Sequence, residues 1–474
     1  MFKTFLNVFK VPELRNKVLF TLFMLLIYRI GYHVTIPGAD QAAFAEMAER
    51  QQSDTSAAGR LASYVSLFSG GNLNQSTIFG LGVMPYISAS IIMQLLTTVV
   101  PTLEKLKKEG QSGQRKIQEW TRFLMIPLCL TQAIMWLSYM EAQKLVAPGL
   151  AGTTAFWVVG TLALTAGSVF LMWVGEQIDE YGLGNGISLI ILAGIVSRMP
   201  SAVIELFSLT SFTAGGSGGE KPLGVGHVIA LICAFLIVVA GSIWVTQAQR
   251  RIPIQQAKHT RGRKVYGGQK QYLPLRVNHG GVMPIIFAQS LMLFPGMVLG
   301  ALASSFAASA AQAGSGGSGW FANTIFFLNN QFGFGQFLYV LTELCMIYFF
   351  AYFWTTVQFQ PKEMANQLRD YGSFVPGLRP GKRTADYLEK VMMHITYVGA
   401  GFLCVIAVVP IFVTTLIGIP YHISAFIGGT GLLIVVSVAL DVVQRIEANL
   451  LMRNYSGFLS EGGNKGKRIK GRQY

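Results

Sequence analysis

Long runs of apolar residues, separated by short polar segments, recur along the whole chain. Each of ten such runs is close to the roughly 20 residues that a helix needs to cross the hydrocarbon core of a bilayer. The runs lie at about 18–36, 77–100, 121–140, 154–174, 186–206, 225–246, 281–303, 335–357, 391–413 and 425–443. The pattern predicts an all-α polytopic membrane protein with ten transmembrane helices.

Charged residues are few and are distributed unevenly between the loops. They make up 12% of the 474 residues, and the net charge is +15; soluble domains carry about 25% charged residues. With the N-terminus inside, 31 of the 37 Lys and Arg residues fall in segments on the inner side and five on the outer side. The positive-inside rule therefore predicts that both termini are cytoplasmic.

One octapeptide occurs twice. Gly82-Val-Met-Pro-Tyr-Ile-Ser-Ala89 returns as Gly281-Val-Met-Pro-Ile-Ile-Phe-Ala288, with six of eight positions identical. Both copies begin an apolar run, the second run and the seventh. Because the copies are five runs apart, an odd number, the second half must be inverted in the membrane, as in inverted-repeat membrane proteins.

The chain divides into two halves around a polar, Gly-rich segment. We expect an N-terminal half at 1–209, an external hinge at 210–224, a C-terminal half at 225–443 and a basic cytoplasmic tail at 444–474. The apolar patch at 61–74 is too short to span a bilayer, so it predicts a short or re-entrant helix on the outer side.

No pattern of catalytic or metal-binding residues is present. The chain has no Walker A sequence, no HExxH and no nucleophile elbow, and its four cysteines lie in four different runs. We therefore expect no catalytic residue, no metal and no cofactor, and a protein that is not an enzyme. Any uphill transport would need energy from a partner or a gradient.

The residues inside the runs leave two functions open. Glu343, an ionisable residue within a span, favours an inverted-repeat secondary transporter of a small solute. Branched aliphatic pairs at i,i+4 spacing, Ile87 with Ile91 and Ile191 with Ile195, would instead form a dewetted constriction if they faced a central path. Such pairs are also common in ordinary helix packing.

Several motifs, in order along the chain, resemble those of the SecY family, the pore subunits of the bacterial protein-translocation channel. The matching segments are Ser76–Gln94, Pro101–Gly110, Phe170–Gln177, Gly184–Ser188, Phe374–Gly381 and Gly428–Val436. The resemblance implies an hourglass pore between two inverted halves of five helices, with a plug and a lateral gate. It also implies a function: conducting secretory polypeptides across the membrane and releasing membrane-protein segments laterally into lipid.

The resemblance also implies roles for individual residues. The pore ring would be formed by Ile87, Ile91, Ile191, Ile195, Ile286 and Ile434; the plug would include Leu61, Tyr64, Val65, Leu67 and Phe68; the lateral gate, between the second and seventh spans, would include Pro85, Gln132, Pro284 and Ser290.

Two basic cytoplasmic loops would dock the driving partner, which is a SecA-type motor ATPase or the ribosome. The residues implied in docking are Arg250, Arg251, Arg261, Arg263, Lys264 and Arg379. Further implied partners are SecE-like and SecG-like small membrane subunits, the translocating polypeptide with its signal sequence and membrane lipid. The resemblance implies no nucleic acid contact other than ribosomal RNA, and a location in the bacterial cytoplasmic (inner) membrane.

Overall fold

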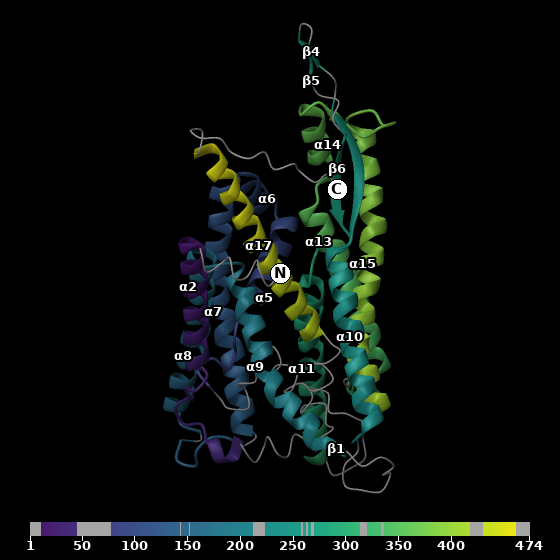
Figure 1. Ribbon diagram of the computed structural model, residues 1–474. Helices are drawn as coiled ribbons and strands as arrows, with labels where there is room; N and C mark the ends of the chain where they lie inside the picture. Colours follow the sequence, from purple (N-terminus) through teal and green to yellow (C-terminus); the bar gives the residue numbers. More distant parts are fainter. Residues whose placement is uncertain are drawn as a thin grey trace.

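Long helices run side by side through most of the molecule, and strands project beyond them at one end (Figure 1). The computed structural model describes residues 11–44, 77–142, 144–150, 152–211, 223–256, 259–261, 264–266, 270–312, 320–332, 336–417 and 430–460. The segment proposed as the plug, most of the hinge, Arg263 and the end of the tail lie outside these residues.

Each of the ten predicted spans corresponds to one long helix among the described residues. These are α2 (Pro12–Gly31), α5 (Met84–Val99), α7 (Gln111–Ala142), α8 (Thr154–Tyr181), α9 (Gly186–Leu209), α10 (Val225–Gln247), α11 (Met283–Gln312), α13 (Phe337–Gln358), α15 (Lys382–Ile417) and α17 (Thr430–Ser460). Three shorter helices connect them: α6 (Pro101–Lys108), α12 (Trp320–Gln331) and α14 (Pro361–Asp370).

Several helices extend past the apolar runs at the end that carries the strands. The helix α7 begins ten residues before the apolar run at 121–140, and α17 continues to Ser460. Such extensions are polar, so hydropathy does not detect them. By length and apolarity alone, six described helices qualify as membrane spans, or seven if α5 and α6, bent by 103°, count as one. The helix α2 does not qualify, because Arg15, Lys17 and Arg29 fall within its 20 residues.

The helices pack as two groups of five with the same pattern of contacts. In the first group α5 packs on α7, α7 on α8 and α8 on α9, while α2 packs on α8 and α9. In the second group α11 packs on α13 and α13 on α15, α15 contacts α17, and α10 packs on α15 and α17. Each of these five pairs of the first group recurs five long helices later in the second group, which agrees with the internal repeat. Between the groups, α9 contacts α17 and α5 makes a small contact with α11.

A small β-sheet joins the two basic loops that the sequence analysis left without structure. The strand β3 (Gln249–Gln256) pairs antiparallel with β6 (Lys270–Arg276), and its far end pairs with β7 (Ser373–Phe374) from the second loop. The sheet and α15 enclose a separate apolar core that includes Ile252, Leu275, Val375 and Leu388. In β3 only alternate residues around Ile252 and Ile254 are buried, which is the strand signal that the basic character of the loop concealed.

The remaining described strands form two short pairs. At the tip of the β3–β6 hairpin, β4 (His259–Arg261) pairs with β5 (Lys264–Tyr266). At the opposite end of the molecule, β1 (Thr210–Ser211) pairs with β2 (Leu223–Gly224) (Figure 1). The two ends of the predicted hinge that the structure describes therefore lie side by side, paired as strands.

The helices α8 and α9 approach each other so closely at Gly186 that a side chain there would collide with the backbone of α8. A Cβ atom added at Gly186 would lie 2.0 Å from the carbonyl oxygen of Gly175, a backbone atom that cannot rotate away. We expect Gly186→Ala to destabilise the protein by about 1–3 kcal/mol, the typical cost of overpacking. The matched control is Gly226→Ala in α10, where an added Cβ meets nothing within 4 Å. The thermal unfolding midpoint of the detergent-solubilised protein measures both, and equal midpoints would contradict the expectation.

Candidate functional site

The two copies of the octapeptide begin their helices with the same backbone conformation. Gly82 has φ 56° and Gly281 has φ 59°, a region that residues with a Cβ rarely adopt. In each copy the helix starts two residues later, at Met84 or Met283, and proline follows, where its missing N–H costs nothing. The repeat therefore places Ile87 and Ile286 at the same helical position in α5 and α11.

A third helix, α9, carries two of the predicted ring residues, and hydrogen bonds cap its N-terminus. The side chain of Asn185 accepts a hydrogen bond from the backbone N–H of Ser188 at 3.0 Å, and Asp179 accepts one from Gly186 N at 2.7 Å. These two bonds satisfy free donors of the first turn of α9 and set its starting point. Ile191 and Ile195 then follow one turn apart, and both are buried.

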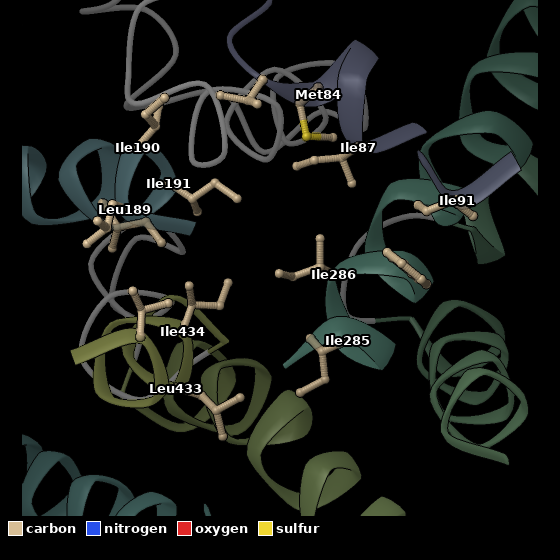
Figure 2. Close-up of a cluster of buried hydrophobic side chains, with 14 of the residues drawn as sticks. Met84, Ile87, Ile91, Leu189, Ile190, Ile191, Ile285, Ile286, Leu433 and Ile434 are labelled. Carbon is tan, nitrogen blue, oxygen red and sulfur yellow. The ribbon is translucent and has the colours of Figure 1, made fainter. Parts of the chain in front are cut away.

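The predicted ring residues meet in one hydrophobic cluster. Figure 2 shows Ile87, Ile191, Ile286 and Ile434 pointing toward a common centre from α5, α9, α11 and α17, two helices from each half. All six predicted residues are 7% exposed or less and belong to this cluster. Ile91 lies to one side of the centre in Figure 2.

Neighbouring side chains that the sequence analysis did not name extend the ring. Met84 lies one turn before Ile87, and Leu433 precedes Ile434; both are buried in the same cluster. The i,i+3 spacing of Met84 and Ile87 was available in the sequence. For Leu433 no periodicity distinguished it from the other aliphatic residues of its run.

The residues predicted for the lateral gate are placed on the helices that flank the seam between α5 and α11. Pro85 and Pro284 are buried at the starts of those helices. Ser290 is also buried, and its hydroxyl donates to the carbonyl oxygen of Ile286 at 2.7 Å, within α11. Gln132 is half-buried on α7. Apolar residues of α5 and α11, Ile87 and Ile286 among them, belong to one hydrophobic cluster at this seam.

The basic residues predicted for docking lie at the end of the molecule that carries the sheet (Figure 1). Arg250 and Arg251 are exposed on β3, and Arg379 is exposed in the loop after β7. Because β3 pairs with β7, the two loops form one surface rather than two. Arg261 and Lys264 belong to the β4–β5 hairpin, and Arg263 lies outside the described residues.

Ionisable residues in the spans have different environments. Glu343 on α13 is 2% exposed, and Gln289 of α11 donates a hydrogen bond to it at 3.4 Å. Arg29 is exposed, and its guanidinium lies 5.9 Å from the centre of the Tyr32 ring. Asp441 accepts a hydrogen bond from Arg445 at 2.8 Å. Among the described residues, no group of three or more His, Cys, Asp or Glu side chains could hold a metal ion.

The SecY family model matches residues 77–443, which include nine of the ten long helices at least in part. The chain belongs to the SecY family. Protein translocase subunit SecY of Thermotoga maritima is 39% identical over 471 residues, which cover 99% of this chain and 100% of the relative. The channel-forming translocase function expected from the sequence is thereby confirmed, and the solute-transporter alternative is not supported.

Solved channel structures share the fold across most of the chain. One is a SecY protein whose plug domain is described as stabilising the closed state of the translocation channel and maintaining a membrane seal (TM-score 0.57, 19% identity, 93% of this chain and 94% of that chain). Another is Sec61 in a canine ribosome–channel complex from the endoplasmic reticulum (TM-score 0.54, 17% identity, with the same coverage). At these identities the likeness establishes the fold alone, that of an all-α polytopic membrane protein.

Proposed function

We propose that the isoleucines at the centre of Figure 2 form the seal of the pore through which polypeptides cross the membrane. The observation that supports this is the convergence of Ile87, Ile191, Ile286 and Ile434 from both halves on one centre. An apolar constriction excludes hydrated ions, because it offers no hydrogen bonds to replace their water. Its side chains can separate around a bulky chain without breaking a polar contact.

A pore of this kind removes the main barrier to secretion. A charged side chain inserted into lipid costs about 2.5–3.5 kcal/mol on insertion scales, and every unpaired backbone group adds to that cost. A water-filled path on either side of the ring avoids both costs. A sufficiently hydrophobic segment gains free energy by leaving the path for lipid, and we propose that it leaves between α5 and α11, past Pro85, Pro284, Gln132 and Ser290.

The remaining parts of the proposal concern regions and partners. The segment 61–74 closes the outer side of the ring as a plug, in keeping with the plug domain described for the solved SecY structure. The division at 1–209, 210–224 and 225–443 separates the two halves, and 444–474 forms a basic cytoplasmic tail. The protein resides in the bacterial cytoplasmic membrane with both termini inside, and it assembles with SecE-like and SecG-like subunits. Copurification of small membrane subunits with the tagged chain tests the assembly.

Docking of the driving partner is assigned to the surface that β3 and β7 form together. Arg250, Arg251 and Arg379 are exposed there, and Arg261 and Lys264 belong to the β4–β5 hairpin between β3 and β6. We include Arg263, which lies outside the described residues, from the sequence alone. A SecA-type motor ATPase or the ribosome, through ribosomal RNA, would be attracted by this positive charge. Solved complexes of related channels with ribosomes support the ribosome as a partner.

Polar substitutions in the ring test the seal. We expect Ile286→Asn, and equally Ile87→Asn or Ile195→Asn, to raise the ion conductance of the resting channel and the export of proteins with weak signal sequences. The reason is that an amide in the constriction holds water where the isoleucine excluded it. Ile286→Leu keeps the site apolar and serves as the matched control. Wild-type conductance and wild-type export in the asparagine variants would refute the seal.

A crosslink across the seam tests the lateral gate. Cys129, Cys233, Cys345 and Cys404 are first replaced, since all four are free thiols. Ile87→Cys and Ile286→Cys, whose side chains point toward each other in Figure 2, are then joined by a short thiol crosslinker. We expect insertion of membrane-protein segments to stop and to resume when a cleavable linker is cut. The same double variant without linker is the control; insertion that persists in the crosslinked channel would show that segments leave elsewhere.

Charge reversal tests docking. We expect Arg250→Glu or Arg251→Glu to weaken binding of the motor ATPase or of ribosomes to channel proteoliposomes by about tenfold at low salt, and less at high salt because the surface charge is screened. Lys144→Glu, exposed in the loop between α7 and α8, makes the same change of charge away from the sheet. Equal binding by the Lys144 and Arg250 variants would argue against the assignment.

A further inference from the structure

Two of the neighbours of α11, α5 and α13, differ strongly in character. Toward α5 its contact is small and apolar, at the ring. Toward α13 it has an extended interface, in which Phe287 makes edge-to-face contacts with Phe350 at 5.8 Å and Trp354 at 5.5 Å. Beside these rings lies the polar pair Gln289 and Glu343, 3% and 2% exposed.

The polar pair lies one turn from the ring. Gln289 follows Ile286 by three residues, so its side chain is offset by only about 60° around α11 from that of Ile286. Gln289 contacts Glu343 of α13, while Ile286 points to the centre of the cluster. On α13, Glu343 belongs to a buried stripe with Tyr339 and Ile347, at i−4 and i+4. On the far side, Cys404 of α15 donates a hydrogen bond to the carbonyl oxygen of Leu344 at 3.8 Å. Glu343 therefore lies inside the C-terminal half, between α11 and α15.

Separating α11 from α13 would be costly in a membrane, whereas separating α11 from α5 would not. A carboxyl group and an amide exposed to lipid have no replacement partner, and each such group costs up to several kcal/mol. Exposing the apolar side chains between α5 and α11 to lipid costs little free energy, because lipid tails are as apolar as those side chains. The C-terminal half therefore keeps α11 when the seam opens.

We propose that Glu343, through its hydrogen bond with Gln289, positions α11 on the C-terminal half and thereby holds Ile286 in the pore ring. Glu343 is in this sense a positioning residue that sets how hydrophobic a signal segment must be to open the seam. This inference rests on the proposed seal and gate. It assigns a role to Glu343, an ionisable residue that takes part neither in the proposed conduction of polypeptides nor in the proposed docking of a partner.

The test replaces the pair and measures selectivity in the complete channel complex in proteoliposomes. The double variant Glu343→Leu with Gln289→Leu removes both members of this hydrogen bond, so neither is left buried without the other. We expect export of a reporter with a weakened signal sequence to rise about fivefold, the effect of losing roughly 1 kcal/mol of hydrogen bonding, and resting ion conductance to rise with it. Export with a strong signal sequence stays at the wild-type level.

Two further variants separate positioning from general loosening of the core. Glu343→Gln retains a hydrogen-bond acceptor for Gln289, so we expect it to behave as wild type. Thr355→Val removes the buried hydrogen bond at 3.1 Å between Thr355 of α13 and Thr396 of α15, which does not involve α11. We expect this control to leave the selectivity for signal sequences unchanged.

Three outcomes would overturn the inference. The first is wild-type selectivity for signal sequences in the double leucine variant, at a normal yield of the complex. The second is a Glu343→Gln variant that loses selectivity as the double leucine variant does. The third is the same loss of selectivity in the Thr355→Val variant. Failure of the proposed function gives a different result from all three. Export of the reporter with a strong signal sequence would then not require the wild-type chain.

Discussion

The structure depends on the meeting of isoleucines from both halves at one centre. A route for polar polypeptides must be wet, yet a wet hole would short-circuit the membrane, so the barrier has to be apolar and thin. In the proposed seal, four helices meet this requirement by directing Ile87, Ile191, Ile286 and Ile434 toward one point. The two octapeptide copies start α5 and α11 from equivalent glycine conformations, so two of the four side chains owe their positions to the repeat itself.

The strength of packing differs within and between the halves, and this difference suits a channel that opens sideways. Within each half the same five-helix pattern of contacts recurs, with close approaches such as that of Gly186 to Gly175. Between the halves, the contact of α5 with α11 is small and apolar. Apolar contacts are replaced by lipid at little cost, whereas the buried Gln289–Glu343 pair is not. The opening proposed above is then at the small α5–α11 contact rather than at the interface that holds this polar pair.

The sheet of β3, β6 and β7 extends the structure beyond the apolar parts of the helices. It has its own apolar core with α15, which supports the basic residues on its surface. If a partner docks there as proposed, a force on the sheet would reach α15 and the helices packed against it. Arg250 and Arg379, 129 positions apart in sequence, belong to one surface for this reason.

The sequence alone predicted the ten long helices, the internal repeat and, through family resemblance, the isoleucines that meet in the central cluster, because hydrophobic length and Gly-x-x-Pro motifs are local signals. The orientation in the membrane stays a prediction from the basic loops. Tertiary structure alone decided that Ile91 lies beside the centre, that Met84 and Leu433 join the cluster, and that two distant loops share a sheet. It also decided that Glu343 faces Gln289 within the C-terminal half. These outcomes depend on which helix faces lie against each other, and periodicity identifies an apolar face without identifying its neighbour.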